Sequence, residues 1–481
     1  MKGKMLKTMA MLKEKGVEYA DVRINDIVTE SISTENMKTQ MMYTGRTKGY
    51  GIRVFLDGSM GFAASQDFDD MDAIANEALR IAKASKIAQI APVKLAKKDT
   101  VVDNYLTHVE IDPFTVSKKD KLDLLFAAEK AMREAVPELF KTVGNMDFRK
   151  EEKWFMDSDG SDIRQVLYES GSGIEAIAVG NGDIQQRTFP NSFRGNFATA
   201  GYEFVKNMGL VENAPRVARE AAALISADEC PSGFYDLVID GDQMTLQIHE
   251  SIGHPIELDR VLGYEAGYAG TSFLNPEMTG FQYGSEHINI VADATVPKGL
   301  GTFGYDDEGV KAQRVPIITK GIFQNFISSR DTASILDQAS NGTSRADSWG
   351  RIPIVRMTNI NLLPGTFELD ELIAGVEDGL YLSANKSWSI DDKRLNFQFG
   401  CEIAYEIKNG KLTGKIYKNP IYSGITPKFW NACDGVASEK YWKMFGTPNC
   451  GKGEPGQTAH VGHGSSPSRF RKIKVGVTDV K

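Results

Sequence analysis

The sequence predicts an α+β fold, with an N-terminal domain of mixed sheet and helix followed by a β-rich C-terminal domain. Extended runs joined by turn dipeptides alternate with amphipathic helical segments, without the regular βα rhythm of a doubly wound sheet. The 481 residues exceed the size at which one hydrophobic core keeps growing, which favours two domains, with three as the alternative. The 41% hydrophobic and 25% charged content is that of an ordinary globular protein.

The N-terminal segment "MKGKMLKTMAMLKEKG" predicts an amphipathic helix. Met5, Met9 and Leu12 recur at helical spacing, and Gly16 stands where a helix C-cap is expected. Lysines interrupt the apolar run too often for the core of a signal peptide. The segment is therefore interpreted as a helix of the protein and not as a signal peptide.

Two turn signals predict β-hairpins in the first half of the chain. In "GYGIRVFLDGSMGFAAS", Asp57-Gly58 separates two extended runs and tolerates the positive φ angles of a type I′ turn. Between Trp154 and Val179, Asp159-Gly160 separates two further extended runs. Both pairs of runs are predicted to form antiparallel strands.

Three helices are predicted among these strands. The first spans about residues 70–86, with Ile74, Ala78 and Ile81 on its apolar face. The second begins at Ser117, has Asp120 in its first turn and ends before Pro137. The third is an alanine-rich helix over about residues 215–226.

The polar segment "SADECPSG", residues 226–233, is the predicted domain boundary because proline and glycine interrupt it. The domains are accordingly residues 1–226 and residues 227–481. In the second domain the strand "FYDLVID" comes first, and hairpins are predicted at Gly321 and at Asn409-Gly410. One helix, over about residues 366–379, interrupts this β-rich part.

Charge and composition exclude several classes of partner. The net charge of -8 has the wrong sign for a protein that neutralises nucleic-acid phosphates, so no nucleic acid is expected as a partner. No apolar run approaches the roughly 18 residues that span a bilayer, so no membrane is expected either. The four cysteines are far apart and form no C-x-x-C, which makes a reducing, cytoplasmic setting the default.

Two glycine-rich segments match nucleotide-binding motifs only in part. "GSGIEA", residues 171–176, fits a dinucleotide fingerprint, but no helical pattern follows it, and a glycine-rich β-turn is the better interpretation. "GTPNCGKG", residues 446–453, has glycine where a P-loop requires serine or threonine. Neither segment predicts a phosphate site.

The segment "LQIHESIGHPIELD" places His249, Glu250 and His254 in the pattern H-E-x-x-x-H. The usual zinc-peptidase spacing is H-E-x-x-H, whereas five residues on a regular α-helix leave the second histidine roughly 140° from the first. Gly253 and Pro255 favour a helix that ends here, with a left-handed glycine followed by a residue that cannot continue it. A π turn with i to i+5 closure would serve equally. Either geometry allows both histidines to reach one metal ion.

A catalytic zinc needs three protein ligands and an open position, so one further ligand is required. The chemically suitable donors are Glu257, Asp259, His460, His463 and Cys450. Cys450 lies in the glycine-rich "NCGKGEPGQ", a loop that can bring a thiolate close to an ion. The residues alone do not decide between Cys450 and the two histidines. Glu250, beside a ligand, stands where a general base would reach the water.

The chain resembles the TldD/PmbA family of zinc metallopeptidases, and in particular the TldD-type subunit. The resemblance runs nearly end to end, and the stretches that carry it are "GYGIRVFLDGSMGFAAS", "HESIGHPIELD", "DDEG" at residues 306–309, "RMTNINLLPG" at residues 356–365 and "CGKG" at Cys450. This combination is far more specific than any one stretch. Pro255, Ile256 and Leu258 depart from the family pattern, in which glycine is common at the first of these positions.

The resemblance implies a site and an activity. It implies zinc (Zn2+) bound by His249, His254 and Cys450, with Glu250 as the catalytic base that takes a proton from water. It implies hydrolysis of short or unfolded polypeptides by a dimer, either a homodimer or a heterodimer with a sister subunit that lacks the metal motif. The alternative that the residues leave open is a non-catalytic, zinc-stabilised scaffold or adaptor, which a closed fourth ligand would favour.

Overall fold

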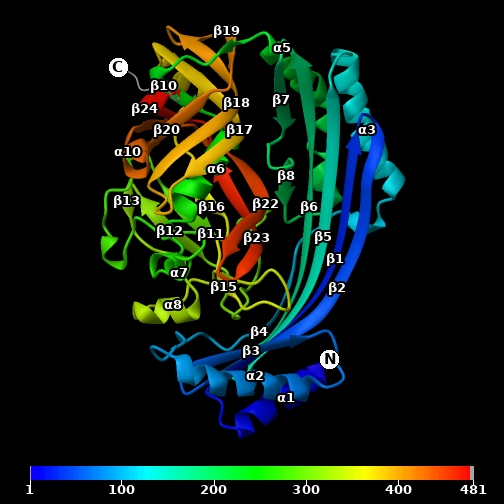
Figure 1. The fold of residues 1–481 in the computed structure, drawn as a ribbon, viewed down its shortest axis with the longest axis vertical. Helices are drawn as coiled ribbons and strands as arrows, with labels where there is room; N and C mark the ends of the chain where they lie inside the picture. Colours follow the sequence, from blue (N-terminus) through cyan, green and yellow to red (C-terminus); the bar gives the residue numbers. More distant parts are fainter. Residues whose placement is uncertain (1, 477–481) are drawn as a thin grey trace.

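The first half of the chain folds around one long, largely antiparallel sheet in the computed structural model of the protein, which describes residues 2–476. The sheet has the strand order β3-β2-β1-β5-β6-β4, with β7 and β8 also paired to β6. Its strands are β1 (Tyr19–Glu35), β2 (Lys38–Leu56), β3 (Ser59–Ser65), β4 (Val102–Leu106), β5 (Lys141–Asp157), β6 (Asp162–Gly180), β7 (Asp183–Phe189) and β8 (Asn196–Ala198). Figure 1 shows the long strands curving along one side of the second half of the chain. The outer ends of the two predicted domains, residue 1 and residues 477–481, lie outside the described part.

Both predicted hairpins in this sheet are confirmed. Asp57 and Gly58 have φ angles of 51° and 72°, and β2 pairs with β3 across them. The strands β5 and β6 pair from Lys141 to Met156, and Gly160 in their turn has a φ angle of 98°. The residues 171–176, predicted as a β-turn, instead lie inside β6, and this interpretation was wrong because the segment is paired on both sides.

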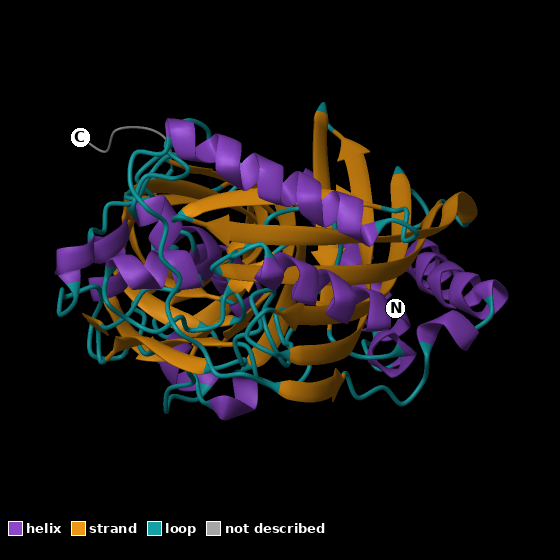
Figure 2. Cartoon of the chain, turned by 90° about the horizontal axis from the view of Figure 1, so that it is seen from below, coloured by secondary structure: helices purple, strands orange, loops and turns teal. Residues whose placement is uncertain are grey.

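Four long helices cover the sheet in two pairs, each with its own core cluster. The first pair, α1 (Lys2–Glu14) and α2 (Met71–Ser85), packs near the Asp57-Gly58 hairpin at the lower end in Figure 1. Figure 2 shows helices lying across the strands when this end is viewed from below. The second pair, α3 (Lys118–Ala135) and α5 (Leu210–Ile225), packs at the other end.

The helix predictions hold with two corrections. Helix α3 begins at Lys118, one residue after the predicted start, with Ser117 as its N-cap, and Met5, Met9 and Leu12 are the buried apolar residues of α1. The buried face of α2 is formed by Met71, Ala75, Ala78, Leu79 and Ala82, so Ile74 and Ile81 lie at its margin. Helix α5 begins five residues before the predicted start, and Pro215, where the prediction began it, lies inside the helix.

The second half of the chain is β-rich, as predicted, and contains a closed ring of strands. The order β17-β10-β24-β20-β18 closes because β17 also pairs with β18. The elements of this part are β9 (Asp228–Glu229), β10 (Gly233–Ile239), β17 (Asp378–Ile390), β18 (Asn396–Lys408), β19 (Lys411–Lys418), β20 (Ile421–Ile425), β21 (Cys433–Val436), β24 (Ser468–Val475), α9 (Leu369–Ala374) and α10 (Thr426–Asn431). The hairpin at Asn409-Gly410 is confirmed, whereas the helix predicted over 366–379 is shorter because β17 begins within that range.

A second group of strands faces this ring across helix α6 (Gly241–Ile248). It consists of the sheet β13-β12-β11-β16 and the separate hairpin β22–β23. The elements are α7 (Leu258–Val261), β11 (Ile290–Asp293), β12 (Arg314–Thr319), β13 (Ile322–Phe323), α8 (Arg330–Ile335), β14 (Ser344–Arg345), β15 (Ile354–Val355), β16 (Ile360–Leu362), β22 (Lys443–Gly453) and β23 (Gly456–Ser465). The hairpin predicted at Gly321 joins β12 to β13. Because α6 is buried between these layers, the residues that follow its last turn have a fixed position.

Within residues 2–476, no helix has both the length and the apolar character needed to cross a membrane. The segment 446–453 forms part of β22, as expected of a sequence that is not a P-loop. The predicted boundary at residue 226 follows helix α5, and the division into two domains at that point stays a prediction.

Candidate metal centre

The two histidines of the H-E-x-x-x-H segment are brought together by a π turn. Helix α6 continues into a single π turn, His249–Gly253, in which the amide of His254 donates to the carbonyl of His249 at 3.1 Å. This i to i+5 closure places the two side chains on the same face, with their ring centroids 4.8 Å apart. Of the two predicted geometries, the π turn is therefore the one that forms.

Gly253 is needed in this turn because it has no side chain. It does not adopt the predicted left-handed conformation. A Cβ atom on Gly253 would lie 2.3 Å from the sulfur of Met357, whose side chain is fully buried. The glycine therefore lets the turn approach the neighbouring layer closely. The prediction of a left-handed C-cap was wrong because tertiary packing, not helix termination, sets this residue.

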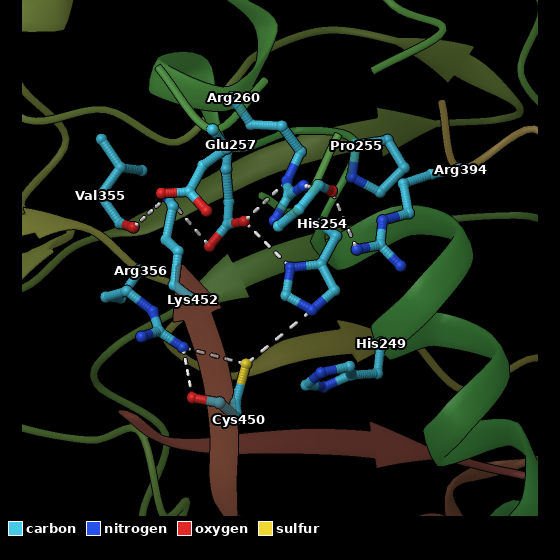
Figure 3. A network of polar contacts seen from close by, with 12 residues as sticks. His249, His254, Pro255, Glu257, Arg260, Val355, Arg356, Arg394, Cys450 and Lys452 are labelled. Carbon is cyan, nitrogen blue, oxygen red and sulfur yellow. Dashed lines mark hydrogen bonds and ion pairs between the residues drawn. The ribbon is translucent and has the colours of Figure 1, made fainter. Parts of the chain in front are cut away.

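The strand β22 carries Cys450 to the same place (Figure 3). One ligand atom each from His249, His254 and Cys450 can be chosen so that all lie within 4.8 Å of one another. The Cys450 sulfur is 3.9 Å from Nε2 of His254. All three side chains are buried, with 7%, 5% and 3% of their surface exposed. The three residues that the family resemblance implied as ligands thus converge from two distant segments.

The other donors that the sequence suggested lie outside this group of three, and two of them contact its histidines from behind. Glu257 Oε2 is 3.0 Å from Nδ1 of His254, on the ring side away from Cys450. Asp259 pairs with Lys452 at 2.7 Å. His463 lies 2.8 Å from Nδ1 of His249, and His460 contacts Glu169 in a separate cavity. None of these four side chains belongs to the His249–His254–Cys450 group.

The protonation states of the three candidate ligands suit metal binding. Burial lowers the pKa of His249 and His254, which keeps both imidazoles neutral. Burial alone would raise the pKa of the Cys450 thiol, but the guanidinium of Arg356, 3.1 Å from the sulfur, is the main cause that lowers this pKa below its usual value. A neutral imidazole and a thiolate are the forms in which these side chains bind metals.

Glu250 is held by an arginine that the sequence analysis did not single out. Nη1 of Arg394 lies 3.0 Å from Oε2 of Glu250, and Nη2 donates to the carbonyl of Ala269. Arg394 lies in the turn between β17 and β18, far from Glu250 in sequence, with a φ angle of 61°. No local pattern predicts this contact. Arg356, by contrast, is the first residue of the quoted stretch "RMTNINLLPG".

The candidate ligands and Glu250 line a cavity of about 520 Å³. Its walls include four large apolar side chains, Phe193, Leu246, Tyr268 and Trp388. Tyr268 and Trp388 are 78% and 52% exposed, so they stand at the mouth of the cavity. The centre is therefore reached from solvent past an aromatic rim.

Comparisons with known proteins place this centre in a family. Profiles of three consecutive domains match the chain: PmbA/TldA metallopeptidase domain 1 over residues 20–82, the central domain over 111–227 and the C-terminal domain over 232–476. A protein of Methanothermobacter thermautotrophicus named "Metalloprotease" is 30% identical over 97% of each chain. A "Metalloprotease TldD homolog" of Haemophilus influenzae is 26% identical over 99% of this chain and 96% of its own.

A further relative and a solved structure agree with this assignment, the first in its name and the second in its fold. A "Zinc metalloprotease TldD homolog" of Saccharolobus solfataricus is 23% identical over 98% of this chain and 99% of its own. Among solved structures, TldE from Thermococcus kodakarensis superposes with a TM-score of 0.75 at 15% identity, covering 98% of this chain and all (100%) of that chain. At that identity the superposition shows the fold alone. The three profiles and the full-length relatives together show that the chain belongs to the TldD/PmbA metallopeptidase family.

Proposed function

We propose that this protein is a zinc-dependent metallopeptidase that hydrolyses short or unfolded polypeptides. The observation that carries the proposal is the convergence of His249, His254 and Cys450 beside Glu250 in a solvent-reachable cavity. Two imidazoles and one thiolate form a donor set typical of catalytic zinc. In a tetrahedral zinc site a nitrogen and a sulfur ligand are about 3.5 Å apart, close to the 3.9 Å between His254 and Cys450.

The residues of the chain have distinct roles in this proposal. Zinc, when bound, polarises the scissile carbonyl and acidifies water. Glu250 takes the proton from the attacking water and passes it to the leaving amine. Arg394 holds the carboxylate of Glu250 in place through the 3.0 Å contact. Arg356 stabilises the thiolate of Cys450 from the opposite side of the sulfur to the cavity's histidines.

An extended peptide can be bound through its backbone at strand β22. Among the described residues the hairpin β22–β23 is a sheet of two strands, so one edge of β22 pairs with no other strand. Side chains contact the backbone of β22 at three points: Asn196 at Gly446, Arg356 at Cys450 and Glu265 at Gly453. Backbone pairing at a strand edge accepts many sequences, which suits unfolded substrates. The aromatic rim of Tyr268 and Trp388 adds apolar surface beside the same strand.

The alternative function is a zinc-stabilised scaffold without catalysis. A structural zinc is closed by four protein ligands, whereas a catalytic zinc keeps one position open. In residues 2–476, the group of donors that could hold a metal has three members. Three ligands beside a carboxylate support the peptidase over the scaffold.

The proposal is tested by measuring zinc content and peptide hydrolysis together. We expect close to one zinc per chain, hydrolysis of unstructured peptides, loss of activity on chelation and its return with zinc. The Glu250→Gln variant should retain zinc and fold while hydrolysis falls by about two to four orders of magnitude, since an amide cannot accept the proton. Zinc binding without hydrolysis of any peptide by the wild-type protein would favour the scaffold.

A further inference from the structure

His463 is a buried histidine whose ring joins the candidate metal centre to a neighbouring sheet. It lies on β23, and its relative exposure is 0%. Its Nε2 is 2.8 Å from Nδ1 of His249, and its Nδ1 is 3.2 Å from the backbone carbonyl oxygen of Ile360. Both ring nitrogens are therefore occupied by contacts that do not involve a metal.

These two contacts determine where the protons lie. A carbonyl oxygen can only accept, so Nδ1 of His463 must carry a proton and donate it to Ile360. A neutral imidazole with a proton on Nδ1 has a lone pair on Nε2. That lone pair accepts from His249, so the proton of His249 lies on Nδ1 and its Nε2 is left with a lone pair.

The opposite arrangement would require a charged His463. A doubly protonated ring could donate to both neighbours, but the two partners of His463 are an imidazole and a carbonyl, and neither carries a negative charge. A fully buried cation without a carboxylate partner is costly. This geometry therefore supports a neutral arrangement, in which His249 donates a hydrogen bond to His463 and His463 donates one to the carbonyl of Ile360.

The backbone on both sides of His463 is anchored, so the ring is held in place. The amide of Gly462 donates to the carbonyl of Thr358 at 3.1 Å, and the amide of Gly464 donates to the side chain of Asn361 at 2.7 Å. Ile360 itself lies in β16, which pairs with β11. The orientation of His249 is thereby tied to the four-stranded sheet.

We propose that His463 is a positioning residue, which fixes His249 in the tautomer with a proton on Nδ1 and so presents Nε2 to the metal. This inference rests on the proposed function in taking His249 as a zinc ligand. His254 is oriented differently, through Glu257 at 3.0 Å from its Nδ1. One ligand is thus oriented by a carboxylate and the other by a neutral ring, which adds no further negative charge to a site that already contains a thiolate.

Zinc affinity in two His463 variants gives the first test. His463→Phe keeps a ring but removes the acceptor, and we expect zinc affinity, measured by competition with a chromophoric chelator, to fall about 10- to 100-fold. His463→Gln restores an acceptor at the position of Nε2, so its affinity should lie within a few-fold of wild type. His460→Phe, on the same strand but in contact with Glu169, is the control and should bind zinc as the wild type does.

The tautomer itself gives a test that needs no metal. The protein has six histidines, so ¹⁵N-histidine labelling gives a spectrum simple enough to assign. In the NMR spectrum of the metal-free wild type, His249 should be protonated on Nδ1 and unprotonated on Nε2. Metal-free His463→Phe should lose this fixed tautomer while its thermal unfolding shows that it remains folded. Protonation of His249 on Nε2, or wild-type zinc affinity in His463→Phe, would overturn the inference.

The two measurements also separate this inference from the proposed function. If the wild type shows the expected tautomer but binds no zinc, the metal role of His249 fails and the positioning role falls with it. If the wild type binds zinc and hydrolyses peptides while His249 is protonated on Nε2, the proposed function stands and the role of His463 alone is overturned.

Discussion

At the scale of single residues, the candidate centre depends on contacts behind the side chains that face the cavity. Glu257 contacts His254, Arg260 and, at 3.6 Å, Lys452, all buried (Figure 3). Although burial alone would raise the pKa of Glu257, Lys452 and His254 hold it well below its usual value. An ionised Glu257 accepts a hydrogen bond from the Nδ1–H of His254, which leaves a lone pair on Nε2 of that ring, on the side of Cys450.

Cys450 is predicted to bind zinc, and this role distinguishes it from the other three cysteines. Burial raises the pKa of Cys230 and Cys433 to about 12 and that of Cys401 well above its usual value. The Cys450 thiol is the one whose pKa lies below the usual value among these four. We expect Cys450→Ala to lose most zinc and activity, whereas Cys433→Ala should retain both.

Zinc stoichiometry across these variants checks the prediction, together with alkylation of the thiols. Cys450 should resist alkylation in the zinc-loaded protein and react after chelation, since the metal occupies its thiolate. Full zinc occupancy in Cys450→Ala would show that another side chain closes the site.

At the scale of elements, the π turn at His249–Gly253 decides whether the H-E-x-x-x-H spacing can work. A Cβ on Gly253 would overlap the sulfur of the buried Met357, so that side chain or the turn would have to shift. We expect Gly253→Ala to lower the free energy of unfolding by about 1–3 kcal/mol, as overpacking of a core does, and to weaken zinc binding by moving His254.

Chemical denaturation with zinc titration measures both effects. Gly350→Ala is the matched control, because nothing lies within 4 Å of a Cβ placed on Gly350, and its stability should change little. Equal stability of Gly253→Ala and the wild type would mean that the turn has more room than the structure indicates.

Elements with a local sequence cause were the ones that the sequence could predict. Asp57-Gly58 and Asn409-Gly410 set positive φ angles within two residues, and both hairpins form. The histidine pair was likewise predicted because its pattern is short. Contacts between distant segments were not: Arg394 reaches Glu250 across 144 positions, and the size requirement at Gly253 comes from Met357. Only the folded layers bring such partners together.

At the scale of the whole molecule, the "DDEG" stretch joins the two halves of the chain. Asp307 pairs with Lys153 at 2.7 Å, and Glu308 pairs with Arg53 at 2.8 Å, so two consecutive acidic residues contact strands β5 and β2 of the first sheet. Asp306 accepts hydrogen bonds from three backbone amides and shapes the turn that presents them. The stretch therefore has a structural role, which is to join the two halves of the chain.

Breaking this connection should destabilise the protein more than breaking a surface ion pair. Arg53 and Glu308 are both buried, so Glu308→Gln should lower the free energy of unfolding by about 3 kcal/mol, at the low end for buried pairs because Asp21 also contacts Arg53. Asp123→Asn, which removes an exposed pair on helix α3, should cost about 0.5 kcal/mol or less. Denaturant unfolding of both variants compares them, and equal small losses would contradict a role for Glu308 between the sheets.

Assembly is the remaining question at this scale, and we predict a dimer, either of identical chains or with a sister subunit. The family resemblance motivates this prediction, and one surface supports it. Strand β3 pairs with β2 only from Tyr50 to Leu56, which leaves the first part of β2 as a sheet edge. Four exposed apolar side chains gather there, namely Met37, Met41, Met42 and Tyr43. An uncovered edge with exposed apolar residues is a typical protein interface.

Light scattering with and without a co-expressed sister subunit tests this prediction. We expect a particle of about twice 53.0 kDa in at least one of the two conditions. Tyr43→Arg should weaken association because it places a charge in the apolar edge, whereas Leu6→Arg, an equally exposed site on helix α1, should not. A 53.0 kDa monomer under both conditions would contradict the dimer. A dimer that both variants leave intact would instead place the interface away from β2, since the charge at position 43 could not then lie within the contact.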